Sequence, residues 1–194
     1  MAGAAVLGRL SWKVCTVVGL RDETATARTI ALQVPEWPGH VAGQRVDLRV
    51  TAADGYSAVR DYSIASAPRA DGRIELSVER LPDGEVSPYL TQNLAIGDVI
   101  EVRGPIGGWF VWREGQVEPI QLIAGGSGIA PLMAMIRSRA AGASAAPFGY
   151  STRSAVRTRC GTATNCGRSP RTASASPSST RAPLLPTGHV LPAA

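Results

Sequence analysis

At residues 60–66 the chain reads Arg-Asp-Tyr-Ser-Ile-Ala-Ser. In a strand, alternation places Arg60 and Tyr62 on one face and Asp61 and Ser63 on the other. A guanidinium can fork onto a phosphate, while a phenol ring can cover a flat heterocycle and a hydroxyl can bond a ring nitrogen. From this segment alone, however, an ordinary edge strand with polar decoration is the favoured interpretation.

Alternating apolar residues on either side of this segment predict further strands. The clearest run is 73–80, where Ile74, Leu76 and Val78 face one way and the residues between them are acidic or hydroxylic. The predicted strands are 12–20, 26–34, 44–50, 59–65, 73–80 and 98–103. Six short strands separated by turns within about 100 residues predict an antiparallel barrel or sandwich.

A turn and a short helix interrupt these strands. Gly84 lies in the turn, and Ser87 followed by Pro88 predicts a helix start with Ser87 as N-cap and a body at 89–94. The first N–H groups of a helix are unpaired and can bind an anion. A hairpin turn followed by a capped helix needs no ligand, and it is the favoured interpretation of this segment taken alone.

The pattern changes after Glu118. An apolar run at 119–124 is typical of a strand buried on both faces; the glycine-rich turn 125–128 and apolar residues at helical spacing over 129–139 follow it. This order, with a second strand at 147–152, predicts the start of a parallel α/β unit. The turn lacks the GxGxxG pattern, so a tight turn without a ligand stays open as an interpretation.

Composition and charge narrow the possible classes of protein. Hydrophobic residues make up 44% of the 194 residues, and no run approaches the roughly 18 apolar residues that a membrane span needs. Three cysteines are too few for an iron–sulfur cluster or a structural zinc site. The start of the chain lacks the pattern of a signal peptide. We therefore expect a cytoplasmic protein with no metal site and no membrane partner.

The charges are unevenly distributed along the chain. All 15 acidic residues lie within 1–118, whereas 119–194 contain eight arginines and no acid. A basic half can indicate a nucleic-acid partner. Here the arginines are scattered and only Phe148 and Tyr150 offer rings for stacking, so we expect no nucleic-acid partner.

Five motifs in this order resemble the ferredoxin–NADP reductase superfamily, most closely its bacterial stand-alone FAD-binding oxidoreductases with an FR-type domain. The motifs lie at 37–44, 60–66, 83–90, 97–108 and 125–131. The resemblance implies an all-β, six-stranded antiparallel flavin-binding barrel, followed by the start of an α/β nicotinamide-binding domain. The implied domains are a FAD-binding barrel at 8–108, a partial NAD(P)-binding domain at 117–154 and a disordered tail at 155–194.

The resemblance also implies an enzyme, a FAD-dependent oxidoreductase that passes electrons from NAD(P)H through FAD to a separate acceptor protein or small molecule. FAD is preferred to FMN because two anion-binding elements suit a pyrophosphate. Arg60 would hold the phosphate, Tyr62 would stack on the flavin ring, and Ser63, the catalytic candidate, would lie near the flavin atom that receives hydride. The implied cofactor-binding residues are Arg60, Tyr62, Ser63, Gly84, Val86, Ser87, Gly125, Gly126, Ser127, Gly128 and Pro131.

The last part of the chain departs from this family. Residues 142–194 are dominated by Ala, Ser, Thr, Arg, Pro and Gly, which predicts disorder, and the family's Cys-Gly-Pro segment is missing. One hypothesis is a reading frame that slips near 154–157, which would give a truncated or frame-shifted C-terminal half. The alternative function is then a truncated flavin-binding fragment without pyridine-nucleotide turnover. We expect His40 to be structural and Cys15 to be a small core residue.

Overall fold

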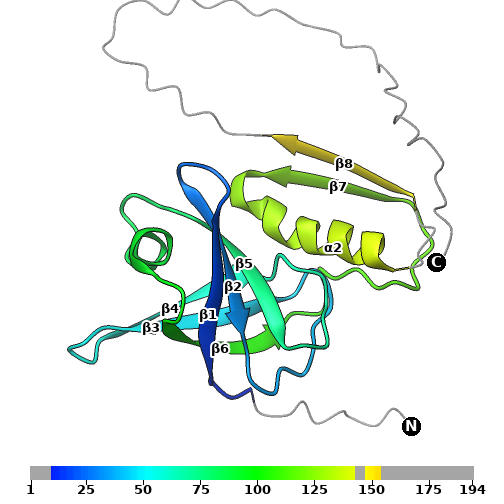
Figure 1. Cartoon of the computed structure of the whole chain (residues 1–194). Helices are drawn as coiled ribbons and strands as arrows, with labels where there is room; N and C mark the ends of the chain where they lie inside the picture. The colour runs from blue at the N-terminus through cyan, green and yellow to red at the C-terminus, as the bar shows by residue number, and fades with distance from the viewer. Residues whose placement is uncertain (1–9, 143–146, 154–194) are drawn as a thin grey trace, which may run out of the picture. The chain divides into compact units, whose positions relative to one another are not determined.

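The computed structural model describes residues 10–142 and 147–153, all of which belong to one structural unit. Six strands form its main sheet in the order β4-β3-β6-β1-β2-β5, and each neighbouring pair is antiparallel (Figure 1). The strands are β1 (Lys13–Asp22), β2 (Ala27–Gln33), β3 (Arg45–Thr51), β4 (Ser57–Ser63), β5 (Arg73–Glu79) and β6 (Val99–Ile106).

The sheet closes into a barrel where its two end strands meet. Just beyond β4, Ile64 forms an antiparallel bridge with Leu76 of β5, and the Ala65 N–H donates to the Glu75 carbonyl at 2.7 Å. The predicted six-stranded antiparallel barrel is therefore confirmed. The strand predicted at 59–65 ends earlier, at Ser63, because Ile64 leaves the ladder with β3 and pairs with β5.

Alternation along the strands fills the barrel. Ile74, Leu76 and Val78 of β5 point inward and are almost completely buried, as their spacing predicts. Leu48 of β3 is buried in the same core, in contact with residues from the other strands. Burying an aliphatic side chain of this size stabilises the fold by about 1.5–3 kcal/mol, so this core supplies much of the barrel's stability.

The short helix does not begin as predicted. Helix α1 (Val86–Pro88) starts one residue before Ser87 and continues into a π-helical turn, η1 (Tyr89–Asn93). The Ser87 hydroxyl accepts a hydrogen bond from the Leu81 N–H at 3.0 Å, so it faces the preceding turn and does not cap the helix. Pro88 is accordingly the last residue of α1, although the sequence predicted it to be the first.

A parallel α/β unit follows, as predicted. Strand β7 (Ile120–Gly125), the 3₁₀ turn η2 (Gly126–Gly128) and helix α2 (Ile129–Ala141) lead to β8 (Phe148–Arg153), which pairs with β7 in parallel. The prediction that the first strand is buried on both faces is wrong for the described residues. Leu122 is buried against α2, whereas Ile123 on the other face is 76% exposed because α2 covers one side only.

Some predictions lie beyond what the structure describes. The disorder predicted from the composition of 142–194 is wrong at Phe148–Arg153, which form β8. The disordered tail predicted at 155–194 and the reading-frame hypothesis lie outside the described residues, and the domain boundaries 8–108, 117–154 and 155–194 stay predictions. Among the described residues, no helix is long and apolar enough to cross a membrane. The same residues contain no cluster of three His, Cys, Asp or Glu side chains that could hold a metal ion.

Candidate functional site

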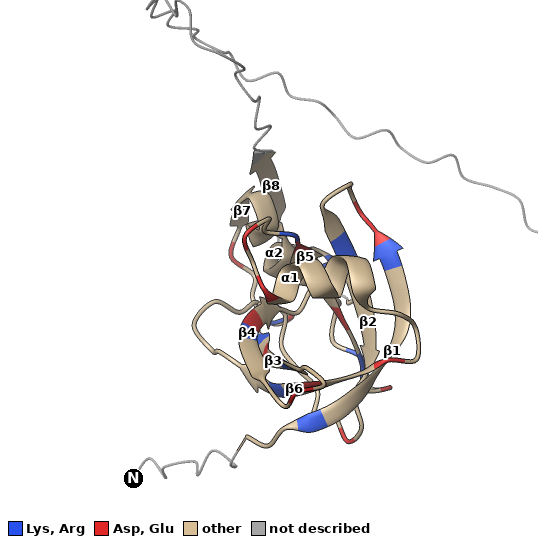
Figure 2. Ribbon diagram, turned by 90° about the vertical axis from the view of Figure 1, so that its left-hand side faces the viewer, with Lys and Arg blue, Asp and Glu red and all other residues tan. Residues whose placement is uncertain are grey.

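A cavity of about 570 Å³ brings the three singled-out motifs together. It lies where β4, β5, the start of α1 and the start of α2 meet. Figure 2 shows these elements. Its volume is in the range of small-molecule sites. The lining residues are Arg60, Asp61, Tyr62, Ser63, Ser77, Glu79, Leu81, Asp83, Gly84, Glu85, Val86, Ser87, Ser127, Gly128, Ala130 and Pro131.

The position of β4 at the end of the sheet explains why four consecutive residues reach this cavity. β4 pairs with β3 along its length, but it is joined to β5 only beyond its end, through Ile64. The residues 60–63 therefore border an opening in the barrel wall, and side chains from both faces of the strand line it. Ile64, next along the chain, is completely buried in the core.

Among the described residues, Arg60 is the only basic one that lines the cavity, and it already has a weak partner. Its Nη2 lies 3.8 Å from Oε2 of Glu85, and its Nη1 donates to the Val59 carbonyl at 2.7 Å. The Tyr56 hydroxyl donates to the same Glu85 oxygen at 3.4 Å. About half of the Arg60 side chain is exposed, so the guanidinium can bind an anion that enters the cavity.

Tyr62 and Ser63 provide a ring and a hydroxyl next to that guanidinium. The Tyr62 ring is half-buried and packs against the barrel core. This burial raises the pKa of the Tyr62 phenol, which therefore stays neutral at physiological pH. Within the described residues the Ser63 hydroxyl forms no hydrogen bond, which leaves it available to a ligand.

The turn before α1 offers fewer backbone amides to an anion than the sequence predicted. The Gly84 N–H donates to the Leu81 carbonyl at 2.9 Å, so that amide is not free to bind an anion. A Cβ on Gly84 would come within 2.9 Å of the Ser87 Oγ, which shows that glycine is needed to close the turn. The amides of Val86 and Ser87 lie in the first turn of a helix, where N–H groups lack partners in their own helix.

The glycine-rich turn reaches the cavity only in part. Ser127, Gly128 and Pro131 line it. Gly126, which has a φ of +55°, instead lines an adjacent cavity of about 460 Å³. Gly125 lines neither cavity; it is the last residue of β7.

Sequence reasoning missed the acidic residues of the cavity. Asp61, Glu79, Asp83 and Glu85 all line it, and Arg60 supplies the one guanidinium among the described lining residues. No local signal predicts that Glu79 lies on the cavity wall, because barrel closure brings β5 and β4 together. An anion in this cavity would therefore depend on Arg60 and on amide donors.

Two other residues with reactive side chains lie outside the cavity. His40 is buried; the Trp37 Nε1–H donates to its Nδ1 at 3.3 Å, so its Nε2 is assigned as the donor to the Ser66 carbonyl at 3.2 Å. Burial lowers the pKa of His40. Cys15 is buried in the core, and burial raises the pKa of its thiol to about 12. Both residues are structural, as expected.

The residues around the cavity fit a flavin nucleotide. A half-buried aromatic ring, a free hydroxyl, a guanidinium and a helix start lie side by side, and these groups suit a flat heterocycle joined to phosphate. The geometry thus favours an organic, phosphate-bearing ligand.

Comparisons with known proteins agree with this chemistry. Residues 17–111 match the family described as the Oxidoreductase FAD-binding domain. The glycine betaine monooxygenase reductase subunit of Chromohalobacter salexigens is 38% identical over 95 residues, which are 49% of this chain and 25% of that protein. The ferredoxin reductase component of 3-ketosteroid-9-alpha-monooxygenase from Mycolicibacterium smegmatis is 36% identical over 124 residues, which are 60% of this chain and 35% of that protein.

Solved structures resemble the chain in fold as well. A cytochrome P450 reductase from Amycolatopsis superposes with a TM-score of 0.66 and 31% identity, covering 77% of this chain and 45% of that one. The ferredoxin reductase in carbazole 1,9a-dioxygenase gives a TM-score of 0.65 at 27% identity, covering 75% of this chain and 43% of that one. The chain thus spans between a quarter and a half of the length of these relatives.

Proposed function

From the premise that this chain carries the FAD-binding domain of the ferredoxin–NADP reductase superfamily, we propose that it is the flavin-binding part of an NAD(P)H oxidoreductase that passes electrons to a separate acceptor. The observation that carries the proposal is the meeting of three motifs, distant in sequence, around one cavity. The relatives named above are reductase subunits or components, which supports an acceptor on another molecule.

The residues on the β4 side would hold the cofactor. Arg60 binds phosphate through its guanidinium, and Tyr62 covers one face of the flavin ring. The amides of Val86 and Ser87 add donors to the same phosphates. FAD, when bound there, would supply the redox chemistry between NAD(P)H and the acceptor. The protein's own contribution is to bind and orient the two reactants.

Ser63 is the residue we assign to the reacting end of the cofactor. It follows Tyr62 directly, lines the cavity and has a hydroxyl without a hydrogen bond among the described residues. A hydroxyl in this position can donate to a ring nitrogen and fix the orientation of the flavin. Its role is therefore to hold a hydrogen bond at the ring.

The glycine-rich turn would face the nicotinamide nucleotide. Gly126 and Ser127 line the second cavity, and Ser127, Gly128 and Pro131 line the first, so the turn borders both. A helix start with close backbone approach suits a pyrophosphate. Gly125 has no part in this proposal beyond ending β7. The acceptor, a separate protein or a small molecule, and the cytoplasmic location belong to the same proposal.

A flavin titration of the full chain tests the cofactor assignment. We expect saturable quenching of FAD fluorescence, and Arg60→Ala should weaken binding by about tenfold to a hundredfold, since hydrogen bonds to charged groups contribute about 1.5–3 kcal/mol. Arg69→Ala is the matched control, because Arg69 is equally exposed and also paired with one carboxylate but lies outside the cavity. Equal losses in the two variants, or no quenching of wild-type samples, would contradict the assignment.

A second candidate function is flavin binding without pyridine-nucleotide turnover. The exposed Ile123 favours it, because one face of β7 is bare among the described residues. Anaerobic mixing of the FAD-loaded chain with NADPH or NADH separates the two functions. Loss of flavin absorbance supports the oxidoreductase, and an unchanged spectrum with both nucleotides supports the binding fragment.

A further inference from the structure

The cavity has two walls that come from different parts of the chain. The segment 60–63 and the turn before α1 form one wall, and Ser127, Gly128 and Pro131, at the start of α2, form the other. The shape of the cavity therefore depends on how α2 is held against the barrel.

One contact that holds α2 is apolar. Met135 of α2 is buried in a cluster with Ala42 and Trp112, which follow β2 and β6 in the barrel part of the chain. Its Cε approaches Gly43 so closely that a Cβ there would lie only 2.7 Å away. Apolar packing of this kind keeps α2 near the barrel, but it lacks the directionality of a hydrogen bond.

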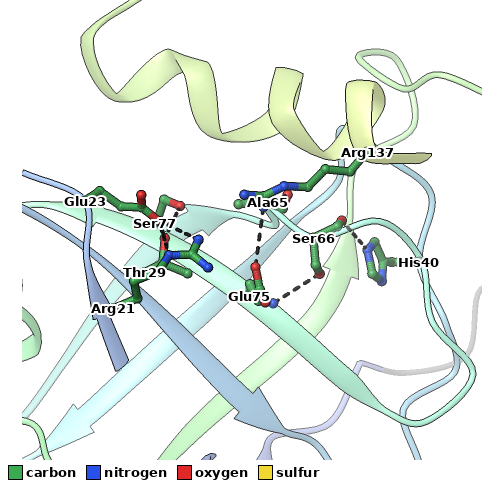
Figure 3. A network of polar contacts seen from close by, with 9 residues as sticks. All are labelled: Arg21, Glu23, Thr29, His40, Ala65, Ser66, Glu75, Ser77 and Arg137. Carbon is green, nitrogen blue, oxygen red and sulfur yellow. Dashed lines mark hydrogen bonds and ion pairs between the residues drawn. The ribbon is translucent and has the colours of Figure 1, made fainter. Parts of the chain in front are cut away.

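A second contact is polar and directional. Arg137 reaches from α2 to the barrel, where its Nη1 donates to the Ala65 carbonyl at 2.7 Å and lies 3.4 Å from Oε2 of Glu75 (Figure 3). About a third of the Arg137 side chain and a quarter of the Glu75 side chain are exposed, so solvent screens this pair only in part. A charged donor strengthens the hydrogen bond to the carbonyl.

The residues that Arg137 binds, Ala65 and Glu75, also close the barrel. The Ala65 N–H donates to the Glu75 carbonyl at 2.7 Å, and the Glu75 N–H donates to the Ser66 Oγ at 3.1 Å. Ala65 is only two residues beyond Ser63, at the end of the strand that lines the cavity. Arg137 therefore joins α2 to the barrel beside the proposed flavin site.

Helix α2 connects Arg137 to the cavity wall opposite β4. Pro131 lies six residues before Arg137, which is about 9 Å along a helix that rises 1.5 Å per residue. Since α2 is continuous between them, a displacement at Arg137 moves the wall as well. A lysine could replace only part of the attachment, because an ammonium lacks the planar fork of a guanidinium.

We propose that Arg137 is a positioning residue for the cavity: by binding Ala65 and Glu75 it sets the distance between the α2 wall and β4, and with it the affinity for FAD. The inference rests on the proposed flavin site. Arg137 lines the second cavity and not the flavin cavity, so it would act on FAD through α2 and not by touching it.

FAD titrations of the full chain test this inference. Arg137→Met keeps the apolar stem and removes the donor, and we expect the dissociation constant for FAD to rise about tenfold. Arg137→Lys should restore part of the loss. Arg139→Met is the matched control on the same helix, where Arg139 lies 5.1 Å from the centre of the Phe148 ring; it should change the constant less than about twofold.

Two further measurements separate positioning from a loss of folding. The visible circular dichroism of bound FAD should change in Arg137→Met and stay unchanged in Arg139→Met, while the far-ultraviolet spectrum of the FAD-free chain stays the same in both. Glu75→Gln keeps the hydrogen bond from Arg137 to the Ala65 carbonyl and should raise the dissociation constant for FAD only about two- to threefold. This milder variant keeps the test valid if Arg137→Met fails to fold.

The outcomes are distinguishable. Loss of affinity in Arg137→Met with partial rescue by lysine and little change in Arg139→Met supports the inference. FAD binding that is the same in wild type and Arg137→Met, or an equal loss in both methionine variants, overturns it and leaves the proposed function intact. A wild-type chain that binds no FAD overturns both.

Discussion

The barrel buries its apolar side chains more completely than the α/β unit does. The barrel joins its two end strands through Ile64 and Leu76, so its side chains fill one core. The α/β unit has two described strands and one helix, and α2 covers one face of them. On the other face Ile123 is 76% exposed.

This difference shows what each region can do alone. A closed sheet satisfies its hydrogen bonds and buries one face completely, so the barrel does not depend on the α/β unit for its core. A parallel sheet needs cover on both faces. We therefore expect the barrel to determine global stability and the α/β unit to open locally at lower cost.

The largest effect should come from shortening one leucine in each region. Leu48 in the barrel is fully buried and Leu132 of α2 nearly so. Leu48→Ala should lower the free energy of unfolding by about 2–5 kcal/mol. Leu132→Ala should change the main transition by less than about 1 kcal/mol, since we expect the α/β unit to open locally before that transition. Urea unfolding followed by far-ultraviolet circular dichroism measures both changes. Equal losses of unfolding free energy in the two variants would contradict the difference between the barrel and the α/β unit.

Adding a methyl group at Gly43, where the barrel contacts α2, should have a smaller effect on stability. Gly43 has a φ of +102°, and an added Cβ would lie in close contact with the Phe110 carbonyl and 2.7 Å from the Met135 Cε. We expect Gly43→Ala to cost about 1–3 kcal/mol, measured as a lower melting temperature.

Gly55→Ala is the control for that substitution. Gly55 has a φ of +89° with no atom near the position of a Cβ, so it carries the backbone strain without the clash. If the two variants melt at the same temperature, crowding around Gly43 contributes nothing to the loss of stability.

The smallest effect concerns an exposed pair that lies outside both cores. The Arg69 guanidinium beside Asp71 lowers the pKa of that carboxyl from 3.8 to about 2. Asp71 therefore stabilises the fold above pH 4, and this contribution is lost as pH falls toward 2. Asp71→Asn should melt below wild type at pH 6, with a difference that shrinks between about pH 4 and 2. A difference that is independent of pH would contradict the assigned pair.

Local patterns were sufficient to predict much of the fold. Alternation at 73–80 predicted the buried face of β5, and the glycine turn at 125–128 predicted the entry into α2. The helix start was wrong because Ser87 bonds back to Leu81, an option that its sequence context does not exclude. The exposure of Ile123 was missed because an apolar run does not show how many neighbours the strand has.

The candidate site was predictable as separate motifs but not as a set. Arg60, Tyr62 and Ser63 were found by their chemistry on one strand, and the structure places them on one cavity wall. Glu79 was missed because its place on the cavity wall depends on how distant segments meet. The amide of Gly84 was also missed; the Leu81 carbonyl occupies it within its own turn. Contacts that arise from barrel closure leave no local pattern in a sequence.

Hydrogen exchange of the full chain with and without FAD tests most directly whether three distant segments form one flavin site. We predict that FAD slows exchange together in 59–63, 84–88 and 126–131, while the strands of the barrel, already slow, change little. Slowing confined to one of these segments, or found only elsewhere in the chain, would contradict the account.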